Sequence, residues 1–190
     1  MSNFFAFMSR MKYIERWGLM RSVQVENIQE HSLQVAMIAH ALAVISNTLY
    51  GGTLNADSIA VKAMYHEASE VITGDLATPI KYFNPEIKLA YKQIEKVATE
   101  KLHDMLPPQL QDAFADIMNG GDREEHNIIK YADRICAYLK CVEETGAGNG
   151  EFSKALKSIK EDIDEITAPE VKYFMNVFAP SFALTLDELG

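Results

Sequence analysis

The sequence predicts a single all-α domain covering residues 1–190. Apolar residues recur at helical spacing along most of the chain, whereas the alternation of strands and the turns of β-hairpins are nearly absent. Helix-start signals are frequent as well, and the clearest are Asn27 with Glu30, Asn84 with Pro85, and Asp122 with Glu125. With 48% hydrophobic residues and no repeat or linker, the chain is expected to bury one sizeable core.

Three helices are expected in the first part of the chain. The first covers residues 4–14, and an irregular polar stretch, 15–28, follows it. A capping box starts the second helix, 28–48, whose apolar stripe consists of Val35, Ile38, Leu42 and Ile45. Asn55 caps the third helix, which we expect to reach about residue 72, where a Thr-Gly-Asp sequence ends it.

Five helices are expected in the rest of the chain. The fourth runs from residue 85 to the Pro107-Pro108 pair and has the cleanest amphipathic pattern. Its inner face is expected to hold Ile87, Tyr91, Ile94, Ala98, Leu102 and Met105. The remaining helices are expected at about 108–118, 122–144, 151–166 and 169–178.

The charge distribution limits the possible ligands. A net charge of −9 argues against binding to polymeric nucleic acid, which needs clustered cations. Residues 1–25 nevertheless carry a net +3, so the remaining residues carry −12. A small cationic zone on an acidic body suits a small anionic ligand, although an ordinary solvated patch would have the same composition.

We expect neither a membrane-spanning segment nor a signal peptide. The longest apolar run, from Val35 to Ile45, contains His40 and is well short of the about 20 residues that a span requires. The N-terminus has no basic region ahead of an apolar one. Cys136 and Cys141 lie on different faces of one predicted helix and cannot pair there, so a reducing cytoplasm is expected.

Histidines and acids occupy helix faces that should be buried. His31 starts the apolar stripe of the second helix, and His66 lies on the inner stripe of the third. Glu67 is adjacent to His66, Glu70 lies one turn further on, and Asp133 stands among apolar residues of the sixth helix. Burying such groups is costly unless their charge is compensated. A divalent cation provides that compensation, with imidazole and carboxylate as ordinary ligands.

Each of these residues alone has an ordinary explanation. A histidine near a helix end is commonly a hydrogen-bonded core residue, and Asp133 could pair with Arg134 or Lys130. The joint pattern favours a metal site, because a lone His, a His beside an acid and a distant Asp each lie on a separate helix. Other motifs are incomplete: residues 66–70 lack the second His of a zincin, and residues 100–103 are the only Glu-x-x-His.

Several segments of the chain closely resemble the YfbR-type 5′-deoxynucleotidases, which are HD-domain phosphohydrolases. The resemblance covers nearly the whole chain. It is carried by Arg16-Trp17, Glu30 to Ala36, Tyr65 to Val71, Thr73 to Leu76, Thr78-Pro79, Lys81 to Phe83, and Ala137 to Lys140. The resemblance implies an HD-domain helical bundle, a homodimer, and a small deoxynucleoside monophosphate as ligand.

The resemblance also implies a ligand set. One divalent cation, such as Co²⁺ or Mn²⁺, would be held by His31, His66, the acid at position 67 and Asp133. The family has Asp at position 67, whereas this chain has Glu67. Glutamate is longer by one C–C bond, about 1.5 Å, so we expect Glu67 to face the metal with weaker or altered affinity and no loss of fold.

Further roles are implied residue by residue. Glu70 matches the catalytic glutamate of the family, and Arg16 and Asp75 are the other candidate catalytic residues. Trp17 is expected to help exclude the ribose 2′-hydroxyl. The predicted substrate-binding residues are Arg16, Trp17, His31, Asp75, Leu76, Ala77, Thr78 and Asp133, where the family usually has Pro at position 77.

These features predict metal-dependent hydrolysis of deoxyribonucleoside 5′-monophosphates to deoxynucleoside and phosphate. Two alternatives stay open. The first is a non-catalytic HD protein that binds nucleotides while Glu67 weakens its metal site. The second is another HD phosphohydrolase, acting on triphosphates or cyclic nucleotides, which the Arg16-Trp17 segment disfavours.

Overall fold

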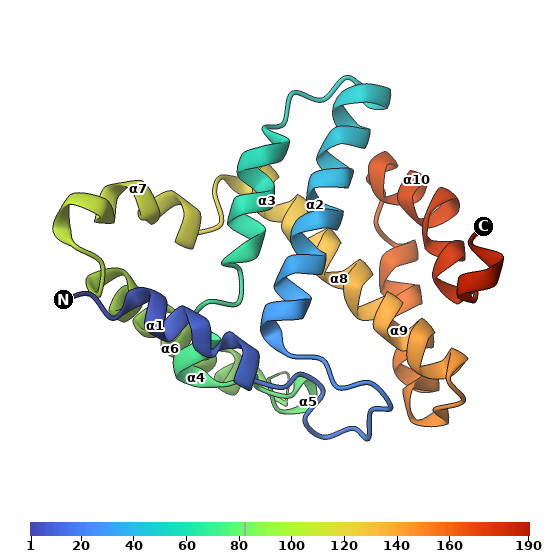
Figure 1. The fold of residues 1–190 in the computed structure, drawn as a ribbon, viewed down its shortest axis with the longest axis horizontal. Helices are drawn as coiled ribbons and strands as arrows, with labels where there is room; N and C mark the ends of the chain where they lie inside the picture. The colour runs from blue at the N-terminus through green and yellow to red at the C-terminus, as the bar shows by residue number, and fades with distance from the viewer. Residues whose placement is uncertain (82) are drawn as a thin grey trace.

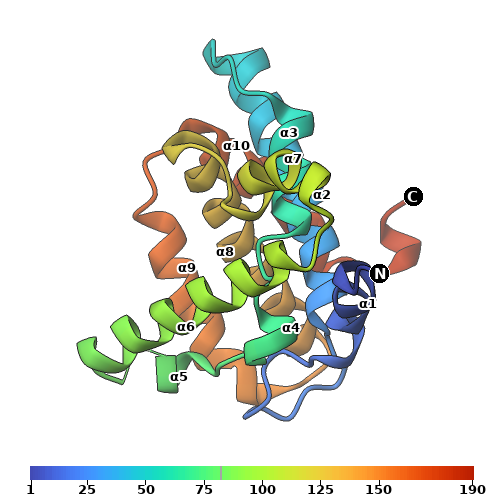
Figure 2. The ribbon, with the colours of Figure 1, turned by 90° about the vertical axis from the view of Figure 1, so that its left-hand side faces the viewer.

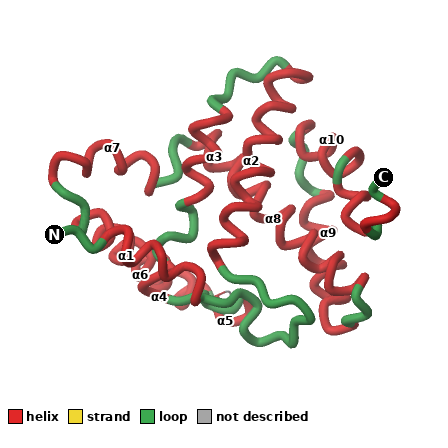
Figure 3. The backbone as a smooth tube through the Cα atoms, in the orientation of Figure 1, coloured by secondary structure: helices red, strands yellow, loops and turns green. Residues whose placement is uncertain are grey.

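The computed structural model describes residues 1–81 and 83–190 as helices joined by loops (Figures 1 and 3). These residues contain no β-strand, so the all-α prediction is confirmed. The α-helices are α1 (Phe4–Met8), α2 (Ile28–Tyr50), α3 (Ala56–Met64), α4 (Glu70–Thr73), α5 (Thr78–Lys81), α6 (Pro85–Asp104), α7 (Pro108–Met118), α8 (Arg123–Gly146), α9 (Ser153–Asp164) and α10 (Pro169–Val177). Short 3-10 helices cover Ser9–Tyr13, Gly150–Phe152, Ala179–Ala183 and Leu186–Glu188.

The central helix is α2, which begins at Ile28 as the sequence predicts. The Asn27 side chain accepts hydrogen bonds from the backbone N–H groups of Gln29 and Glu30, both at 3.0 Å, and completes the capping box. The predicted apolar stripe is buried, and α2 packs against α3, α8 and α10 (Figure 1). The first turn of α2 therefore carries His31 at one end of the core.

Among the described residues, α2 is the one helix whose length and composition match a membrane span. The core helix of a soluble protein meets the same test. Here Val35, Ala39 and Leu42 are fully buried by neighbouring helices. We therefore interpret α2 as the core helix of the bundle.

Two clusters of buried apolar residues form the interior. The larger lies between α2, α3, α8 and α10 and includes Ala63 at the end of α3. The smaller includes Phe4, Ala68 and Leu102 and joins the N-terminal segment to α6. Figures 1 and 2 show α1, α4 and α6 grouped together beside the α2–α3 pair. Residues 65–69 connect the two clusters, and the packing of Ala63 and Ala68 holds this turn at both ends.

The third helix ends earlier than predicted. Its last residue is Met64, not residue 72, and the chain then makes tight turns before α4. The backbone N–H of His66 donates to the carbonyl of Ala63 at 3.3 Å, and its Nδ1 lies 2.7 Å from the same oxygen. These bonds replace the bond to residue 62 that would continue the helix. As a result, His66 and Glu67 lie on a turn and not on a helix face.

The inner face of α6 is only partly as predicted. Tyr91, Ala98 and Leu102 are buried, but Ile94 is 53% exposed, so its prediction as an inner residue is wrong. The helix packs against α1, α4, α5 and α7 along one narrow side. Glu95, the next residue along, is half-buried and pairs with Lys81 of α5 at 2.9 Å. The inner face is therefore rotated toward residue 95.

The stretch between residues 14 and 28 is irregular, as predicted, and folds back on itself. The N–H of Arg16 donates to the carbonyl of Glu26, and that of Ile28 donates to the carbonyl of Ile14, both at 2.9 Å. The far end of this loop is fixed to α8, where the buried carboxylate of Glu144 accepts the N–H groups of residues 23 and 24 at 2.8 and 3.0 Å. Arg16 and Trp17 therefore sit on an anchored loop.

Candidate active site

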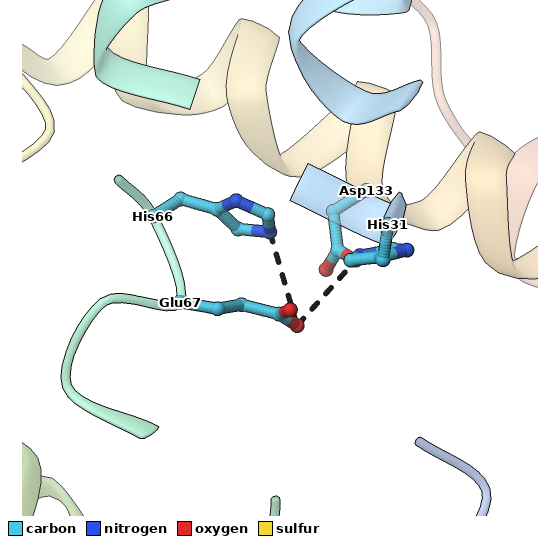
Figure 4. A group of neighbouring side chains, drawn as sticks. All are labelled: His31, His66, Glu67 and Asp133. Carbon is cyan, nitrogen blue, oxygen red and sulfur yellow. Dashed lines mark hydrogen bonds and ion pairs between the residues drawn. The ribbon is translucent and has the colours of Figure 1, made fainter. Parts of the chain in front are cut away.

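Three segments that are distant in the sequence bring four potential metal ligands together. His31 comes from the first turn of α2, His66 and Glu67 from the turn after α3, and Asp133 from the middle of α8 (Figure 4). One ligand atom from each residue lies within 4.8 Å of the others. These are the four positions that the sequence pattern and the resemblance indicate.

The histidines turn one nitrogen each toward the carboxylates. His31 Nε2 lies 3.0 Å from Asp133 Oδ1 and 3.6 Å from Glu67 Oε1, and His66 Nε2 lies 3.9 Å from Glu67 Oε1. The bond between His66 Nδ1 and the Ala63 carbonyl places the proton on Nδ1, because a carbonyl only accepts. The lone pair of His66 Nε2 is then directed into the cluster (Figure 4).

Unsatisfied polar atoms in this cluster fit a divalent cation. His66 Nε2 and Glu67 Oε2 are buried without a hydrogen-bond partner, an arrangement that is costly unless an ion completes it. Two imidazole nitrogens and two carboxylates form an ordinary ligand set for a divalent transition metal. The donor set therefore fits the cation that the sequence predicts.

The His31–Asp133 pair can hold either a proton or a metal ion between its two facing atoms. Burial opposes the charged imidazole, but the hydrogen bond with Asp133 and the nearby carboxylates of Glu26 and Glu67 prevail and raise the pKa of His31 to about 9. Burial opposes the Asp133 carboxylate as well, yet the His31 hydrogen bond and nearby positive charges hold the pKa of Asp133 well below its usual range. Nε2 and Oδ1 are both acceptors when unprotonated, so a proton or a metal ion must lie between them.

Arg16 supplies positive charge to the same carboxylates. Its guanidinium forms an ion pair with Glu67, and its Nε lies 3.3 Å from Glu26 Oε2. A third carboxylate oxygen, Asp133 Oδ1, lies 4.0 Å from its terminal nitrogen. The longer side chain of Glu67 thus contacts the guanidinium while remaining among the ligands. A metal ion and the Arg16 guanidinium would therefore compete for the Glu67 carboxylate.

Glu70 and Asp75 add two more acids beside the cluster. Glu70 is 7% exposed and begins α4, and its Oε2 is buried without a hydrogen-bond partner. Burial raises the pKa of Glu70 above its usual range, and the charges of Glu67 and Asp75 raise it further. The pKa of Asp75 is raised by burial and by Glu67, against the effect of Arg16. Glu70 therefore places a buried carboxyl that can hold a proton beside the cluster.

The other predicted substrate residues are distributed around the loop that follows α4. Leu76 and Ala77 are half-buried in the segment between α4 and α5. The side chain of Thr78, and Tyr82 of the resembling segment, lie outside the described residues.

Trp17 lies on the loop before α2. It has a φ of +60°, and its ring lies against Phe152 with centroids 5.3 Å apart. The indole is therefore held in a fixed position next to Arg16.

Glu26 is part of the site, although no pattern in the sequence identifies it. Its carboxylate accepts the Trp17 indole N–H at 3.0 Å and lies 3.6 Å from His31 Nδ1. The residue stands outside any predicted helix, one position before the Asn27 cap, and no periodicity distinguishes it from Glu15 or Glu30. Its role depends on the fold-back of the loop, which composition and spacing do not reveal.

This helical bundle, with two histidines and two acids gathered in one place, has the fold of solved structures that are described as HD-domain phosphohydrolases. Solved structures agree with this fold. An HD-domain phosphohydrolase from Listeria innocua matches with a TM-score of 0.83 and 23% identity, over 95% of this chain and 88% of that chain. The cyanophage S-2L HD phosphohydrolase DatZ, described as bound to dA and one catalytic Zn²⁺ ion, matches with a TM-score of 0.62 and 17% identity, over 93% and 96%.

The family can be stated more narrowly. The chain belongs to the 5′-deoxynucleotidase YfbR-like family, whose model matches residues 3–182. A 5′-deoxynucleotidase of Vibrio cholerae is 58% identical over 100% of this chain and 98% of its own length. The 5′-deoxynucleotidase YfbR of Salmonella paratyphi B is 56% identical over 100% and 96%. The family resemblance seen in the sequence is therefore confirmed.

Proposed function

We propose that this chain is a metal-dependent 5′-deoxynucleotidase, which converts deoxyribonucleoside 5′-monophosphates to deoxynucleosides and phosphate. The observation that carries this proposal is the convergence of His31, His66, Glu67 and Asp133 next to Arg16. The names of the relatives, which are 5′-deoxynucleotidases at 56–58% identity, support the substrate class. The deoxynucleoside and Zn²⁺ described for the phage structure support the same chemistry.

The four ligands would hold one divalent cation. When bound, the cation supplies charge neutralisation for the phosphate and lowers the pKa of a water molecule, which can reach about 7. Two imidazoles and two carboxylates suit Co²⁺, Mn²⁺ or a similar ion. Glu67 would take part with the carboxylate that now faces both histidines.

The protein side chains would perform the remaining steps. Glu70 would accept a proton from the attacking water, or orient it, as the oxygen–phosphorus bond forms and the bond to the 5′ oxygen breaks. Arg16 would bind the phosphoryl oxygens through its planar fork of donors. Asp75 would bond the sugar 3′-hydroxyl or assist the leaving 5′ oxygen, and the half-buried segment 76–77 would line the sugar.

A panel of nucleotides tests this function. Metal-supplemented protein should release phosphate from deoxynucleoside 5′-monophosphates faster than from ribonucleoside 5′-monophosphates, deoxynucleoside triphosphates or cyclic nucleotides. Preference for triphosphates or cyclic nucleotides would establish a different HD phosphohydrolase. Binding of the deoxynucleotides without phosphate release, at every metal concentration, would establish a non-catalytic binding protein.

Replacing Trp17 with alanine is expected to relax the choice of sugar. An apolar wall rejects an added hydroxyl by about 10²-fold, and Trp17 is held next to Arg16 by Phe152 and Glu26. The ratio of kcat/KM for deoxy- and ribonucleoside 5′-monophosphates should fall toward one in Trp17→Ala. Trp17→Phe keeps a ring against Phe152 and should retain most of the preference. Equal rates on both sugars in the unmodified protein would contradict this role.

Replacing Glu67 with aspartate is expected to raise metal affinity by about tenfold or more, the scale on which changes around metal ligands act. The shorter side chain should release the Arg16 guanidinium that now pairs with Glu67 and approach the family arrangement. Calorimetric titration with Mn²⁺ measures the affinity, and phosphate release should increase with it. A variant that binds the metal no better and turns over no faster would show that Glu67 is not a weakened ligand.

We further propose that the enzyme is a homodimer of the cytoplasm. Exposed apolar side chains on adjacent faces of α2 and α3, among them Leu33, Met37 and Met64, form a surface that suits contact with a second copy. Cys136 and Cys141 are both buried and free, which suits a reducing compartment.

A further inference from the structure

The backbone places Glu26 directly opposite Arg16. The stretch 14–28 folds back so that Glu15 and Asn27 form an isolated antiparallel bridge. The Arg16 N–H donates to the Glu26 carbonyl at 2.9 Å. Glu26 is thus fixed next to the two residues assigned to the substrate, and it lies five positions before His31.

The side chain of Glu26 contacts three functional residues. Oε2 accepts the indole N–H of Trp17 at 3.0 Å and lies 3.3 Å from Arg16 Nε. Oε1 lies 3.6 Å from His31 Nδ1, the nitrogen that faces away from the metal ligands. The Glu26 side chain is only 12% exposed, while that of His31 is fully buried. One carboxylate therefore joins the metal side and the substrate side of the site.

The charge of Glu26 suits this position. The Arg16 guanidinium and the Trp17 indole N–H both face Oε2, so a carboxylate at this position meets a positive charge and a hydrogen-bond donor. A histidine that binds a metal usually donates its other ring N–H to a carboxylate or carbonyl, which fixes the tautomer and the ring orientation. Glu26 is the carboxylate that lies next to Nδ1 of His31 and can fix the orientation of its ring.

We infer that Glu26 is a positioning residue that links the metal ligand His31 to the substrate residues Arg16 and Trp17. Through His31 Nδ1 it orients the ring so that Nε2 faces the metal. Through Arg16 Nε and the Trp17 indole, it fixes the positions of the Arg16 guanidinium and the Trp17 ring relative to the metal ligands. The assignment of substrate roles rests on the proposed function, whereas the link to metal binding does not.

The test uses Glu26→Gln, which preserves size but removes the charge. We expect metal affinity, measured by calorimetric titration with Mn²⁺ or Zn²⁺, to fall by about 10–100-fold. Trp17 is the single tryptophan of the chain, so its emission reports the same contact and should shift. Glu26→Asp keeps the charge with a shorter reach and should lose less affinity. If Glu26→Gln does not fold, the metal affinity of Glu26→Asp tests the same role.

Glu30→Gln is the matched control. Glu30 lies four positions away, and its carboxylate caps the N–H of Asn27 at 3.3 Å without contacting the site. It should leave metal affinity and tryptophan emission unchanged. If Glu26→Gln shifted the emission but bound metal like the unmodified protein, Glu26 would only hold the loop and the inference would be overturned. Because the metal titration needs no turnover, failure of the proposed function would be seen separately, in the nucleotide panel.

Discussion

Replacing His31, His66 or Asp133 with alanine is expected to remove the bound metal and to lower phosphate release by about 10³-fold or more. Metal ions contribute several kcal/mol of transition-state stabilisation, and each 1.36 kcal/mol corresponds to about a tenfold change in rate. The three side chains come from three separate segments, and one ligand atom of each lies within 4.8 Å of the others. Elemental analysis measures the metal, and a phosphate assay measures the rate.

The other three histidines provide matched controls for this result. His40 Nε2, on α2, lies 3.4 Å from Asp57 of α3, and His103 Nε2 lies 2.9 Å from the Gln111 carbonyl. His126, in the first turns of α8, is also absent from the cluster. Alanine at these positions should leave the metal content unchanged. Full metal occupancy in the His31, His66 and Asp133 variants would contradict the ligand assignment.

Replacing Arg16 with glutamine is expected to lower turnover and raise metal affinity in the same protein. Loss of one donor to the reacting oxygens typically lowers kcat by about 10²–10³-fold. Metal binding should strengthen, because the guanidinium pairs with Glu67 and lies 4.0 Å from Asp133, and so neutralises the charge that attracts the cation. Steady-state kinetics and calorimetric titration with Mn²⁺ measure the two effects.

Arg21→Gln is the control for Arg16, since its side chain is 94% exposed and pairs with Glu151 outside the cluster. It should change neither turnover nor metal affinity appreciably, because exposed ion pairs contribute little. If Arg16→Gln weakened metal binding, the guanidinium would be supporting the ligand set and not competing with the cation for Glu67.

The helical architecture was predictable because its signals are local. Apolar spacing places the buried stripe of α2, and the capping residues Asn27, Asn84 and Asp122 each accept helix N–H groups as predicted. The histidines and acids were noticeable because they interrupt faces that pack inward. A local pattern therefore located both the main helices and the ligand candidates.

Other features depend on contacts between distant residues. The end of α3 at Met64 follows from bonds that His66 makes with the Ala63 carbonyl, and these override a helical pattern that continues to residue 72. The exposure of Ile94 follows from which side of α6 meets α4 and α5. Periodicity gives a helix its apolar side but does not indicate how far neighbouring elements cover it.

The arrangement around Glu67 also required the structure. The sequence shows a longer acid where the family has Asp, and chain length alone allows the side chain to fold back, the cation to move or the ligand to be lost. In the structure, Glu67 Oε1 faces His31 and His66 while pairing with Arg16. The fold-back of the loop that carries Arg16 and Glu26 produces this pairing, and no spacing in the sequence predicts it.

Restoration of activity by metal is the most direct test of metal-dependent deoxynucleotidase chemistry. Chelator-treated protein would be supplied with increasing Mn²⁺, Co²⁺ or Zn²⁺, and phosphate release from a deoxynucleoside 5′-monophosphate would be compared with bound metal in the same samples. We expect almost no release without metal and a rate that rises with bound ion until about one site per chain is filled. Unchanged release after complete chelation, or no release from fully loaded protein, would contradict the account.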